Sequence, residues 1–386
     1  MIILVGTIFI FYLGGVLYLC FRWAAAWRLL RQEAARPTLD AEGADWPTME
    51  VVIPVKDEEA HLATCVRSVL SQDYPNLSVI VVNDRSTDRT PEVIAELQAE
   101  FPRLRRMDIT ELPGGLYGKP HALSRAGTEL SAEIVVFVDS DFELAPHCLK
   151  TLVHDLRRRR LDWLAVMGKP QLQKFWERLL VPMLGAITYA WYDPRKIEDP
   201  KWDNAIGSGF LVVRREAYQA IGGHGAVVRA YDEDSEIMRI AKRAGHAISY
   251  VLAPELFTLR MYGTLRRTVH GISRTFVGGL KTLPRFLATI NAINFVSLLP
   301  IGILFLLGIA AWKGWAIPWE SAWLTLAVLH LIASTGLAYV IYGGAGDYRR
   351  FAFIHPLAAA MLIGICIRAA RELSRREPIQ WRGTSY

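Results

Sequence analysis

The chain has 386 residues, of which 52% are hydrophobic, and it carries a formal net charge of +6. This length and apolar content exclude a single ordinary soluble domain. The basic residues flank apolar stretches instead of alternating with aromatic residues in a soluble region, so nucleic-acid binding is not expected. The four cysteines lack paired metal-ligand spacing, which is typical of core residues in a reducing compartment.

Residues 1–22 are predicted to form an N-terminal transmembrane helix. The stretch from Ile2 to Cys20 has no charged residue, and its length as a helix matches a hydrocarbon core of roughly 30 Å. A cleaved signal peptide is disfavoured because bulky Phe21 and Trp23 follow where small residues would be needed. Residues 23–47 mix arginine and tryptophan before a linker, which predicts an interfacial helix and a tether.

Residues 48–260 are predicted to form an α/β domain. The β-branched run Met49–Val55 predicts a buried strand, and His61–Gln72 predicts the helix after it. The alternation of a predicted strand and a predicted helix then recurs along the chain. This pattern favours a mostly parallel sheet with helices on both faces. The later predicted elements are Leu77–Val82, Pro91–Phe101, Ile134–Val138 and Pro146–Arg157. Ligands of such sheets bind beyond the carboxyl ends of the strands.

The apolar stretch Leu179–Tyr192 lies inside this domain and is too short to cross a membrane. It is expected to be a core helix or a helix lying on the membrane interface. Residues 261–285 mix basic and apolar residues, which predicts an amphipathic interface segment.

Residues 286–370 are predicted to form C-terminal membrane helices, and residues 371–386 a basic tail. The uncharged stretches there are Phe286–Trp312, Ser321–Gly346 and Phe351–Ile367. Together with the first span they predict a multi-pass protein of the plasma (inner) membrane.

The distribution of arginines predicts the orientation of this protein. Arginines after the first span predict that the soluble domain is cytoplasmic. Three further spans would put the basic tail outside, against this tendency. The stretch that contains Pro300 or the one that contains Pro356 is therefore expected to be re-entrant or interfacial.

Two aspartates, Asp139 and Asp141, directly follow the predicted strand Ile134–Val138. Two carboxylates at a strand end can hold a hard divalent cation, Mg²⁺ or Mn²⁺, which would bridge them to the phosphates of a ligand. An Asp-x-Asp string also arises by chance in loops, and its position at the strand end is what favours a metal site.

Other polar or glycine-rich strings come at element ends. Asp84 lies just after the second predicted strand, where it could accept hydrogen bonds from a base or ribose, or belong to a turn that caps the next helix. Lys119 follows two glycines and suits a phosphate or a sugar hydroxyl. The string Gly207-Ser208-Gly209 could let the backbone approach a sugar closely.

Four acidic residues fall within the five positions from Asp232 to Glu236, at the expected start of a helix. The positive end of the helix dipole accounts for one or two of them. Crowding of the remaining carboxylates raises a pKa toward that of a useful general base.

These strings together resemble glycosyltransferase family 2, whose nucleotide-diphospho-sugar-binding fold is called GT-A. The resemblance covers roughly residues 48–260, with the family's order and approximate spacing. The matching strings are Val52-Ile53-Pro54-Val55-Lys56-Asp57-Glu58-Glu59, Val82-Asn83-Asp84-Arg85-Ser86-Thr87-Asp88, Gly118-Lys119, Asp139-Ser140-Asp141, Gly207-Ser208-Gly209 and Glu233-Asp234 with Gly245 downstream.

The resemblance implies a role for each matching residue. Asp234 would be the general base of an inverting, metal-dependent transfer, and Asp139 and Asp141 would hold the metal. The residues assigned to the nucleotide sugar, expected to be a UDP-sugar, are Val55, Glu59, Asp84, Lys119, Asp139, Gly207, Ser208, Gly209 and Glu233.

The layout of the whole chain resembles lipid-directed members of the family, the carotenoid, hopanoid-associated and ceramide-type glycosyltransferases. It implies transfer of one sugar to the hydroxyl of a membrane lipid. Processive synthases carry Gln-x-x-Arg-Trp after the base, and this string is absent here, so Arg274 and Trp381 are the candidates for acceptor contacts. The alternatives are a polysaccharide synthase and a non-enzymatic membrane scaffold, and no protein partner is inferred.

Overall fold

The computed structural model describes residues 45–317 and 319–375, together with single positions near the two termini. The predicted N-terminal span, interfacial helix and linker lie almost entirely outside the described residues. The chain folds into two compact units. Among the described ranges, residues 45–171 and 192–261 form the sheet unit, and residues 172–191 and 262–375 form the helical unit.

The sheet unit is built on a seven-stranded sheet with strand order β3-β2-β1-β4-β8-β6-β9. Strand β8 runs antiparallel to both of its neighbours, whereas the other pairs are parallel. The mostly parallel sheet predicted from the sequence is therefore confirmed. Its strands are β1 (Met49–Val55), β2 (Leu77–Asp84), β3 (Leu104–Ile109), β4 (Ile134–Val138), β6 (Trp163–Met167), β8 (Phe210–Arg214) and β9 (Ile248–Leu252).

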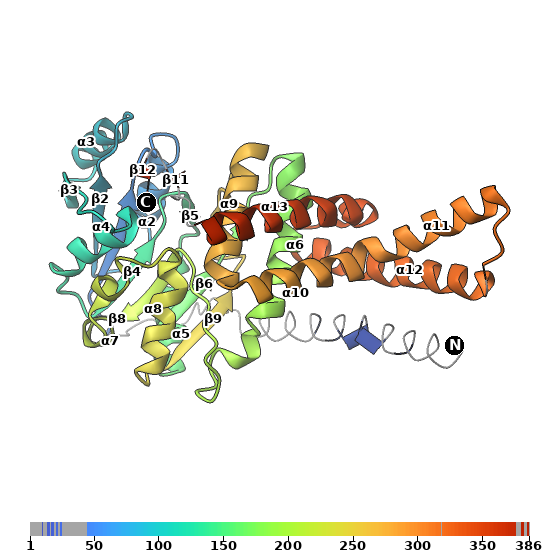
Figure 1. The fold of residues 1–386 in the computed structure, drawn as a ribbon. Helices are drawn as coiled ribbons and strands as arrows, with labels where there is room; N and C mark the ends of the chain where they lie inside the picture. The colour runs from blue at the N-terminus through green and yellow to red at the C-terminus, as the bar shows by residue number, and fades with distance from the viewer. Residues whose placement is uncertain are drawn as a thin grey trace. The chain divides into compact units, whose positions relative to one another are not determined.

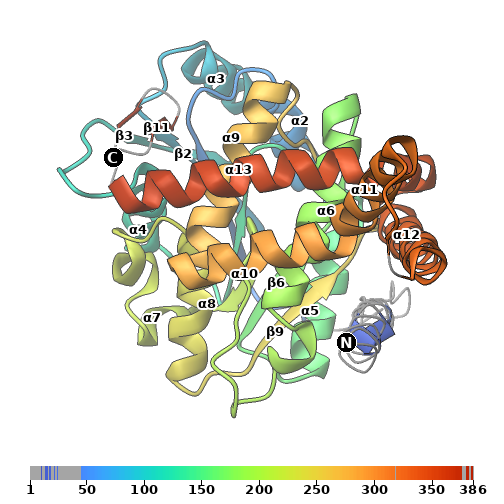
Figure 2. The ribbon, with the colours of Figure 1, turned by 45° about the vertical axis from the view of Figure 1, so that its right-hand side comes forward.

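Helices cover both faces of this sheet, as Figures 1 and 2 show. The sheet unit contains the α-helices α2 (Leu62–Leu70), α3 (Thr90–Glu100), α4 (Gly118–Gly127), α5 (Cys148–Arg158), α7 (Arg215–Ala220) and α8 (Glu233–Arg243). Short 3-10 helices are η1 (Pro194–Lys196) and η2 (Gly223–Val227). A second, three-stranded sheet joins β5 (Phe142–Leu144), β10 (Phe257–Leu259) and β7 (Lys169–Pro170).

The helical unit contains three helices that are long and apolar enough to cross a membrane: Leu283–Lys313, Glu320–Gly344 and Arg349–Arg375. The three predicted C-terminal stretches are therefore helical, and their crossing of a membrane stays a prediction. The elements of the unit are α6 (Phe175–Trp191), α9 (Leu265–Leu280), α10 (Leu283–Ile293), the π-helix η3 (Asn294–Leu298), α11 (Leu299–Lys313), α12 (Glu320–Gly344), the 3-10 helix η4 (Arg349–Ile354) and α13 (His355–Arg375).

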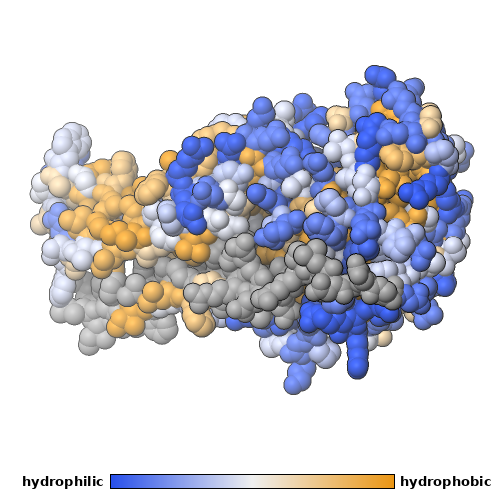
Figure 3. Space-filling model, turned by 180° about the vertical axis from the view of Figure 1, so that it is seen from behind, coloured by the Kyte–Doolittle hydropathy of each residue, from blue (hydrophilic) through white to orange (hydrophobic). Residues whose placement is uncertain are grey.

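Apolar side chains that contact little protein gather on the pair formed by α11 and α12, and Figure 3 shows them as apolar surface. Phe305, Leu306 and Ile332 each expose more than 60% of their surface. Exposed apolar surface of this kind suits a hydrocarbon environment better than water.

Helix α6 packs within the helical unit. Leu179 and Leu180 are fully buried, and the helix contacts α9, α12 and α13. Tyr342 of α12 donates a hydrogen bond of 2.7 Å from its hydroxyl to the carbonyl oxygen of Leu179. The stretch Leu179–Tyr192, predicted from its sequence to be a core or interfacial helix, thus lies largely within a packed helix of the helical unit.

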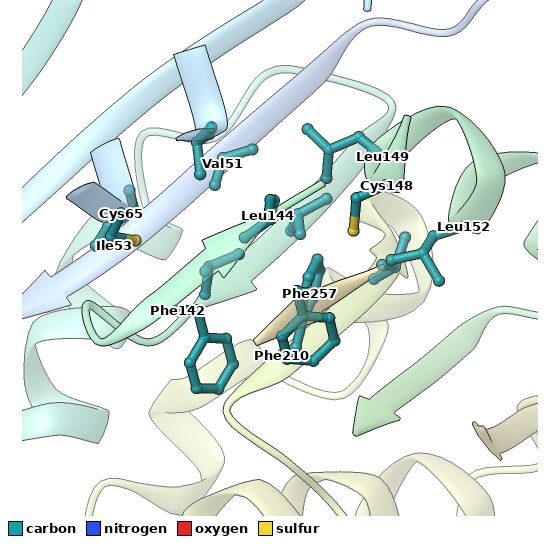
Figure 4. Close-up of a cluster of buried hydrophobic side chains, with 14 of the residues drawn as sticks. Val51, Ile53, Cys65, Phe142, Leu144, Cys148, Leu149, Leu152, Phe210 and Phe257 are labelled. Atoms are coloured by element: carbon teal, nitrogen blue, oxygen red, sulfur yellow. The ribbon is translucent and has the colours of Figure 1, made fainter. Parts of the chain in front are cut away.

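The core of the sheet unit follows from alternation along its strands. Val51 and Ile53 point to one face, where they pack with α2, α5 and the aromatic residues of the second sheet (Figure 4). Phe137 points to the other face and lies 5.2 Å from the ring of Tyr218 on α7. Because both faces are covered, the polar strand ends remain the only natural place for a ligand in this sheet type.

Candidate active site

Polar side chains from neighbouring strands meet at one edge of the large sheet. The parallel register of β1 with β2 and β4 brings the carboxyl ends of these three strands together. Lys56 follows β1, Asp84 ends β2 and Asp139 follows β4. The predicted location of the site beyond the strand ends is thereby given a structural basis.

The centre of the site is an ammonium group surrounded by carboxylates. Lys119 lies in the first turn of α4, and its Nζ is 2.9 Å from Oδ1 of Asp139 and 2.9 Å from Oε1 of Glu233. The same Nζ is 3.2 Å from Oδ2 of Asp234. Glu233 and Asp234 begin helix α8, as the acidic run predicted. We call Lys119, Asp139, Glu233 and Asp234 the carboxylate cluster.

Little of the carboxylate cluster is exposed to solvent. The side chain of Lys119 is 19% exposed, that of Glu233 10% and that of Asp234 23%. Burial raises the pKa of Asp234 well above its ordinary value, and although Lys119 opposes this, Glu233 and Asp139 raise the pKa further. Burial lowers the pKa of Lys119, but the three carboxylates outweigh burial and raise it overall. The lysine therefore stays protonated, and Asp234 holds a proton more strongly than an ordinary aspartate does.

Two glycines make this packing possible. A Cβ on Gly209 would lie 2.0 Å from Oδ2 of Asp139, and a Cβ on Gly207 would lie 1.9 Å from the backbone oxygen of Asp234. The backbone N–H of Asp139 also donates a hydrogen bond of 3.0 Å to the carbonyl oxygen of Gly209. The glycines let Asp139 and the backbone of Asp234 lie close to the segment before β8, and the approach of these glycines to a sugar stays a prediction.

Ser208, which lies between these glycines, holds two strands together. Its hydroxyl donates to the carbonyl oxygen of Val166 at 2.8 Å and accepts a hydrogen bond of 3.2 Å from the backbone N–H of the same residue. Val55 is also part of the scaffold, because its side chain lies in the hydrophobic core. Nucleotide-sugar binding by either residue remains a prediction.

The loops after β1 and β2 are tied to each other. Asp84 is buried, and its carboxylate accepts hydrogen bonds of 2.7 and 3.0 Å from the guanidinium of Arg85. Lys56 is buried, and its ammonium donates to the carbonyl oxygen of Arg85 at 3.0 Å. Glu59 is exposed and accepts a hydrogen bond of 3.0 Å from the backbone N–H of Arg89. A nucleotide contact by Asp84 or Glu59 remains a prediction.

The metal prediction rests on Asp139 and Asp141. Among the described residues, no group of three or more histidine, cysteine or acidic side chains has the arrangement of a metal site. Two carboxylates are nevertheless a suitable donor set for Mg²⁺ or Mn²⁺, because these ions take further oxygen ligands from substrate phosphates and water. Asp139 is paired with Lys119 in this structure, so a cation is already favoured at its carboxylate.

The structure gives less detail on the two residues predicted to contact the acceptor. Arg274 lies on α9 of the helical unit and is partly buried. Trp381 lies in the short strand β11, and its side chain is outside the described part of the chain. Contact of either residue with an acceptor remains a prediction.

Comparison with known protein families identifies the region that contains these strand ends. Residues 50–222 match the family described as "Glycosyl transferase family 2". The chain contains a glycosyl transferase family 2 domain. The matched range includes the ends of β1, β2 and β4, the lysine of α4 and the glycines beside β8.

Curated relatives of the matched region include proteins named β-monoglucosyldiacylglycerol synthase. The β-monoglucosyldiacylglycerol synthase of Nostoc sp. is 26% identical over 183 residues, which cover 46% of this chain and 38% of the relative. The corresponding protein of Synechocystis sp. is 28% identical over 205 residues, which cover 50% of this chain and 40% of the relative. The chain thus matches about two fifths of the length of these relatives.

A solved structure supports the GT-A-like fold. It is the mannosyltransferase PcManGT from Pyrobaculum calidifontis in complex with GDP-Man and Mn²⁺, with a TM-score of 0.51 and 19% identity. The similarity covers 94% of this chain and 98% of that one. The predicted α/β fold class is therefore confirmed, whereas the predicted membrane helix at the N-terminal end lies outside the described residues.

Two residues of the family 2 domain were missed by the sequence analysis. Lys56 and Arg85 connect the strand ends, and Arg85 adopts a left-handed backbone with φ of 55°. Lys56 directly follows a predicted buried strand, and this position is the sequence feature that could have indicated its place at the strand ends. Nothing in the local sequence predicts the conformation of Arg85, because non-glycine residues seldom adopt it.

Proposed function

We propose that the protein moves one sugar from a nucleotide-diphosphate donor to the hydroxyl group of a membrane lipid, with inversion at the anomeric carbon. The observation that carries the proposal is the carboxylate cluster, in which Asp139, Glu233 and Asp234 converge on Lys119 beyond the strand ends of a family 2 domain. A buried ammonium beside a carboxylate of raised pKa provides both a partner for an anionic donor and a proton acceptor.

Asp234 is the proposed general base. Its carboxylate takes the proton of the acceptor hydroxyl while the hydroxyl oxygen forms a bond to the anomeric carbon of the sugar. The bond from that carbon to the diphosphate breaks, and the nucleoside diphosphate leaves with the electron pair. Because attack and departure occur on opposite sides, a single displacement inverts the anomeric carbon.

Lys119 and Asp139 are proposed to face the donor. The ammonium of Lys119 suits the diphosphate, and pairing with phosphate would release the carboxylate of Asp234 for its role as base. Asp139 and Asp141 would hold Mg²⁺ or Mn²⁺, which when bound neutralises charge on the diphosphate. The donor is proposed to be a UDP-sugar.

A lipid acceptor is supported by two separate observations. Curated relatives of the domain are named β-monoglucosyldiacylglycerol synthases. Within the described residues, three helices have the length and composition of membrane spans, so the catalytic domain would work beside lipid. We therefore propose an enzyme of the inner membrane that acts on its cytoplasmic face, where nucleotide sugars are made.

A transfer assay on the purified full chain tests this proposal. The protein is reconstituted in phosphatidylcholine nanodiscs that contain diacylglycerol or another hydroxyl-bearing lipid. Labelled UDP-glucose, UDP-galactose, UDP-N-acetylglucosamine and GDP-mannose are supplied in turn with Mg²⁺, with Mn²⁺ or with a chelator. Extracted lipids are then analysed by mass spectrometry and NMR.

The expected product is a lipid heavier by one sugar, with the anomeric configuration opposite to that of the donor. A ladder of increasing masses would instead support a processive synthase. Absence of transfer for every donor and acceptor, from protein that still binds nucleotide, would contradict the proposal.

A further inference from the structure

A pocket of about 490 Å³ lies in the helical unit, apart from the residues of the carboxylate cluster. Three segments of the chain line it: α6, the last part of α12, and the turn before η4 together with the first residues of η4. Its lining residues, which we call the arginine pocket, are Arg178, Tyr339, Asp347, Tyr348, Arg349 and Arg350.

The arginine pocket has an excess of positive charge. It contains three guanidinium groups and one carboxylate, that of Asp347, which pairs with Arg349. The side chain of Asp347 is 78% exposed, and that of Arg349 is 48% exposed. Because an exposed ion pair is weak, this carboxylate neutralises the pocket only in part, and a further anion is favoured there.

Aromatic rings support the guanidinium groups. Arg178 lies 5.7 Å from the centre of the Tyr348 ring, and Arg349 lies 5.5 Å from the centre of the Tyr339 ring. Arg178 is held further by a hydrogen bond of 2.9 Å from its Nε to the carbonyl oxygen of Leu172. A guanidinium that stacks through its flat face keeps N–H groups at its edge for a phosphate or carboxylate.

The position of the pocket along the chain identifies the kind of anion. Helix α12 has 25 residues, and at 1.5 Å per residue it is long enough for a hydrocarbon core of roughly 30 Å. The pocket lies at the carboxyl end of this helix, where an apolar span gives way to the charged residues Asp347, Arg349 and Arg350. Tyrosines and arginines at such a boundary lie at the level of the lipid headgroups.

We propose that the arginine pocket binds the phosphate of an anionic phospholipid headgroup. Two guanidinium edges face one phosphate, and the tyrosine rings border the glycerol part of the headgroup. The volume of the pocket lies within the range of small-ligand sites. This binding is separate from catalysis and does not depend on the proposed function.

The test uses the purified full chain in a neutral detergent. Short-chain phosphatidylglycerol, short-chain phosphatidylcholine and inorganic phosphate are titrated separately, and the thermal unfolding midpoint is followed. A ligand that binds only the folded protein raises this midpoint, and the rise grows with the logarithm of the ligand concentration divided by its Kd. Phosphatidylglycerol is expected to raise the midpoint at a concentration about tenfold lower than phosphatidylcholine does, as a contact worth about 1.4 kcal/mol would predict.

The triple variant R178Q/R349Q/R350Q is expected to lose this preference for phosphatidylglycerol. The matched control is Lys313→Gln, which removes a cation at the other end of the α11–α12 pair and should keep the preference. The single variants Arg349→Gln and Arg350→Gln alter exposed side chains and give the same readout should the triple variant not fold.

Three results would overturn the proposal. One is equal stabilisation by the two lipids. Another is a preference that survives in the triple variant. The third is stabilisation by inorganic phosphate that matches stabilisation by phosphatidylglycerol, since it would assign the pocket to a free anion.

Discussion

Two groups of charges in this protein are built in opposite ways. In the sheet unit, one ammonium is surrounded by three carboxylates, and the three side chains other than Asp139 are less than a quarter exposed. In the helical unit, three guanidinium groups share a pocket with one carboxylate, and the paired Arg349 and Asp347 are 48% and 78% exposed. The first group has an excess of negative charge, and the second has an excess of positive charge.

Burial determines how each group responds to its unbalanced charge. In the buried carboxylate cluster, the excess changes proton affinity and holds the pKa of Asp234 well above its ordinary value. In the exposed arginine pocket, water and salt screen the excess, which then serves mainly to attract a counter-ion. Substitutions in the carboxylate cluster should therefore change the rate of transfer strongly. Substitutions in the arginine pocket should change the free energy of unfolding little.

The largest effect is expected for Asp234→Asn. The amide cannot accept the proton of the acceptor, so kcat should fall by about 10² to 10⁴, the usual contribution of a general base. Nucleotide binding, measured by calorimetry, should persist. Asp203→Asn is the matched control, because Asp203 is an exposed carboxylate of the same unit that pairs with Arg243. Equal activity of the two variants would remove Asp234 from the mechanism.

A smaller but still large effect is expected for Gly209→Ala. The added methyl group would lie 2.0 Å from Oδ2 of Asp139, so the carboxylate or strand β8 must move. A displacement of this size in a catalytic site costs up to about 10²-fold in rate. Gly225→Ala is the control, because its Cβ would lie 3.5 Å from Oγ of Ser124, an ordinary contact. Transfer rates of the two variants should differ, and unchanged transfer by Gly209→Ala would show that Asp139 needs no such packing.

Substitutions at Glu233 and Lys119 should move the pH profile in opposite directions. Glu233 raises the pKa of Asp234 and Lys119 lowers it, and Asp234 must be deprotonated to act as base. The acidic limb of the kcat/KM profile should therefore shift to lower pH in Glu233→Gln and to higher pH in Lys119→Gln. Shifts of the same sign in both variants would contradict the proposed coupling.

Acid should destabilise the sheet unit through His224. Burial lowers the pKa of this histidine from 6.5 to about 3, with Lys119 as a further cause. Between these values the unfolded chain binds a proton that the folded chain does not, so stability is lost as the pH falls from 6.5 toward 3. The loss is about 1.4 kcal/mol per pH unit.

His224→Phe keeps an aromatic ring beside Phe137 and removes the titration. The thermal midpoint of this variant should fall less steeply between pH 6.5 and 5 than that of the unaltered protein, even where its midpoint at neutral pH is lower. Parallel curves for the two proteins would show that His224 does not resist protonation.

The smallest effect is expected for Arg349→Gln in neutral detergent without anionic lipid. Its ion pair with Asp347 is exposed, so the free energy of unfolding should change by less than about 1 kcal/mol. Thermal unfolding measures this change. A loss of several kcal/mol would mean that the arginine pocket is a buried structural network. The pocket would then not differ in this respect from the carboxylate cluster.

Much of the sheet unit could be predicted from local sequence. Met49–Val55 and Ile134–Val138 are strands within the predicted bounds, because continuous β-branched and apolar runs suit strands buried on both faces. The acidic run at Glu233 does begin a helix. The position of Asp139 at a strand end could also be predicted, because polar residues directly follow the apolar run Ile134–Val138.

The assembly of the carboxylate cluster was decided by tertiary structure. Lys119 and Asp234 are 115 positions apart, and no local pattern predicts that their side chains meet. The roles of Gly207 and Gly209 were equally hidden, because the atoms that would clash with a side chain there belong to residues 234 and 139. Local patterns depend on neighbours along the chain and can be read from it. Contacts between distant segments depend on strand order and packing, which decided here that one lysine would be surrounded by three carboxylates.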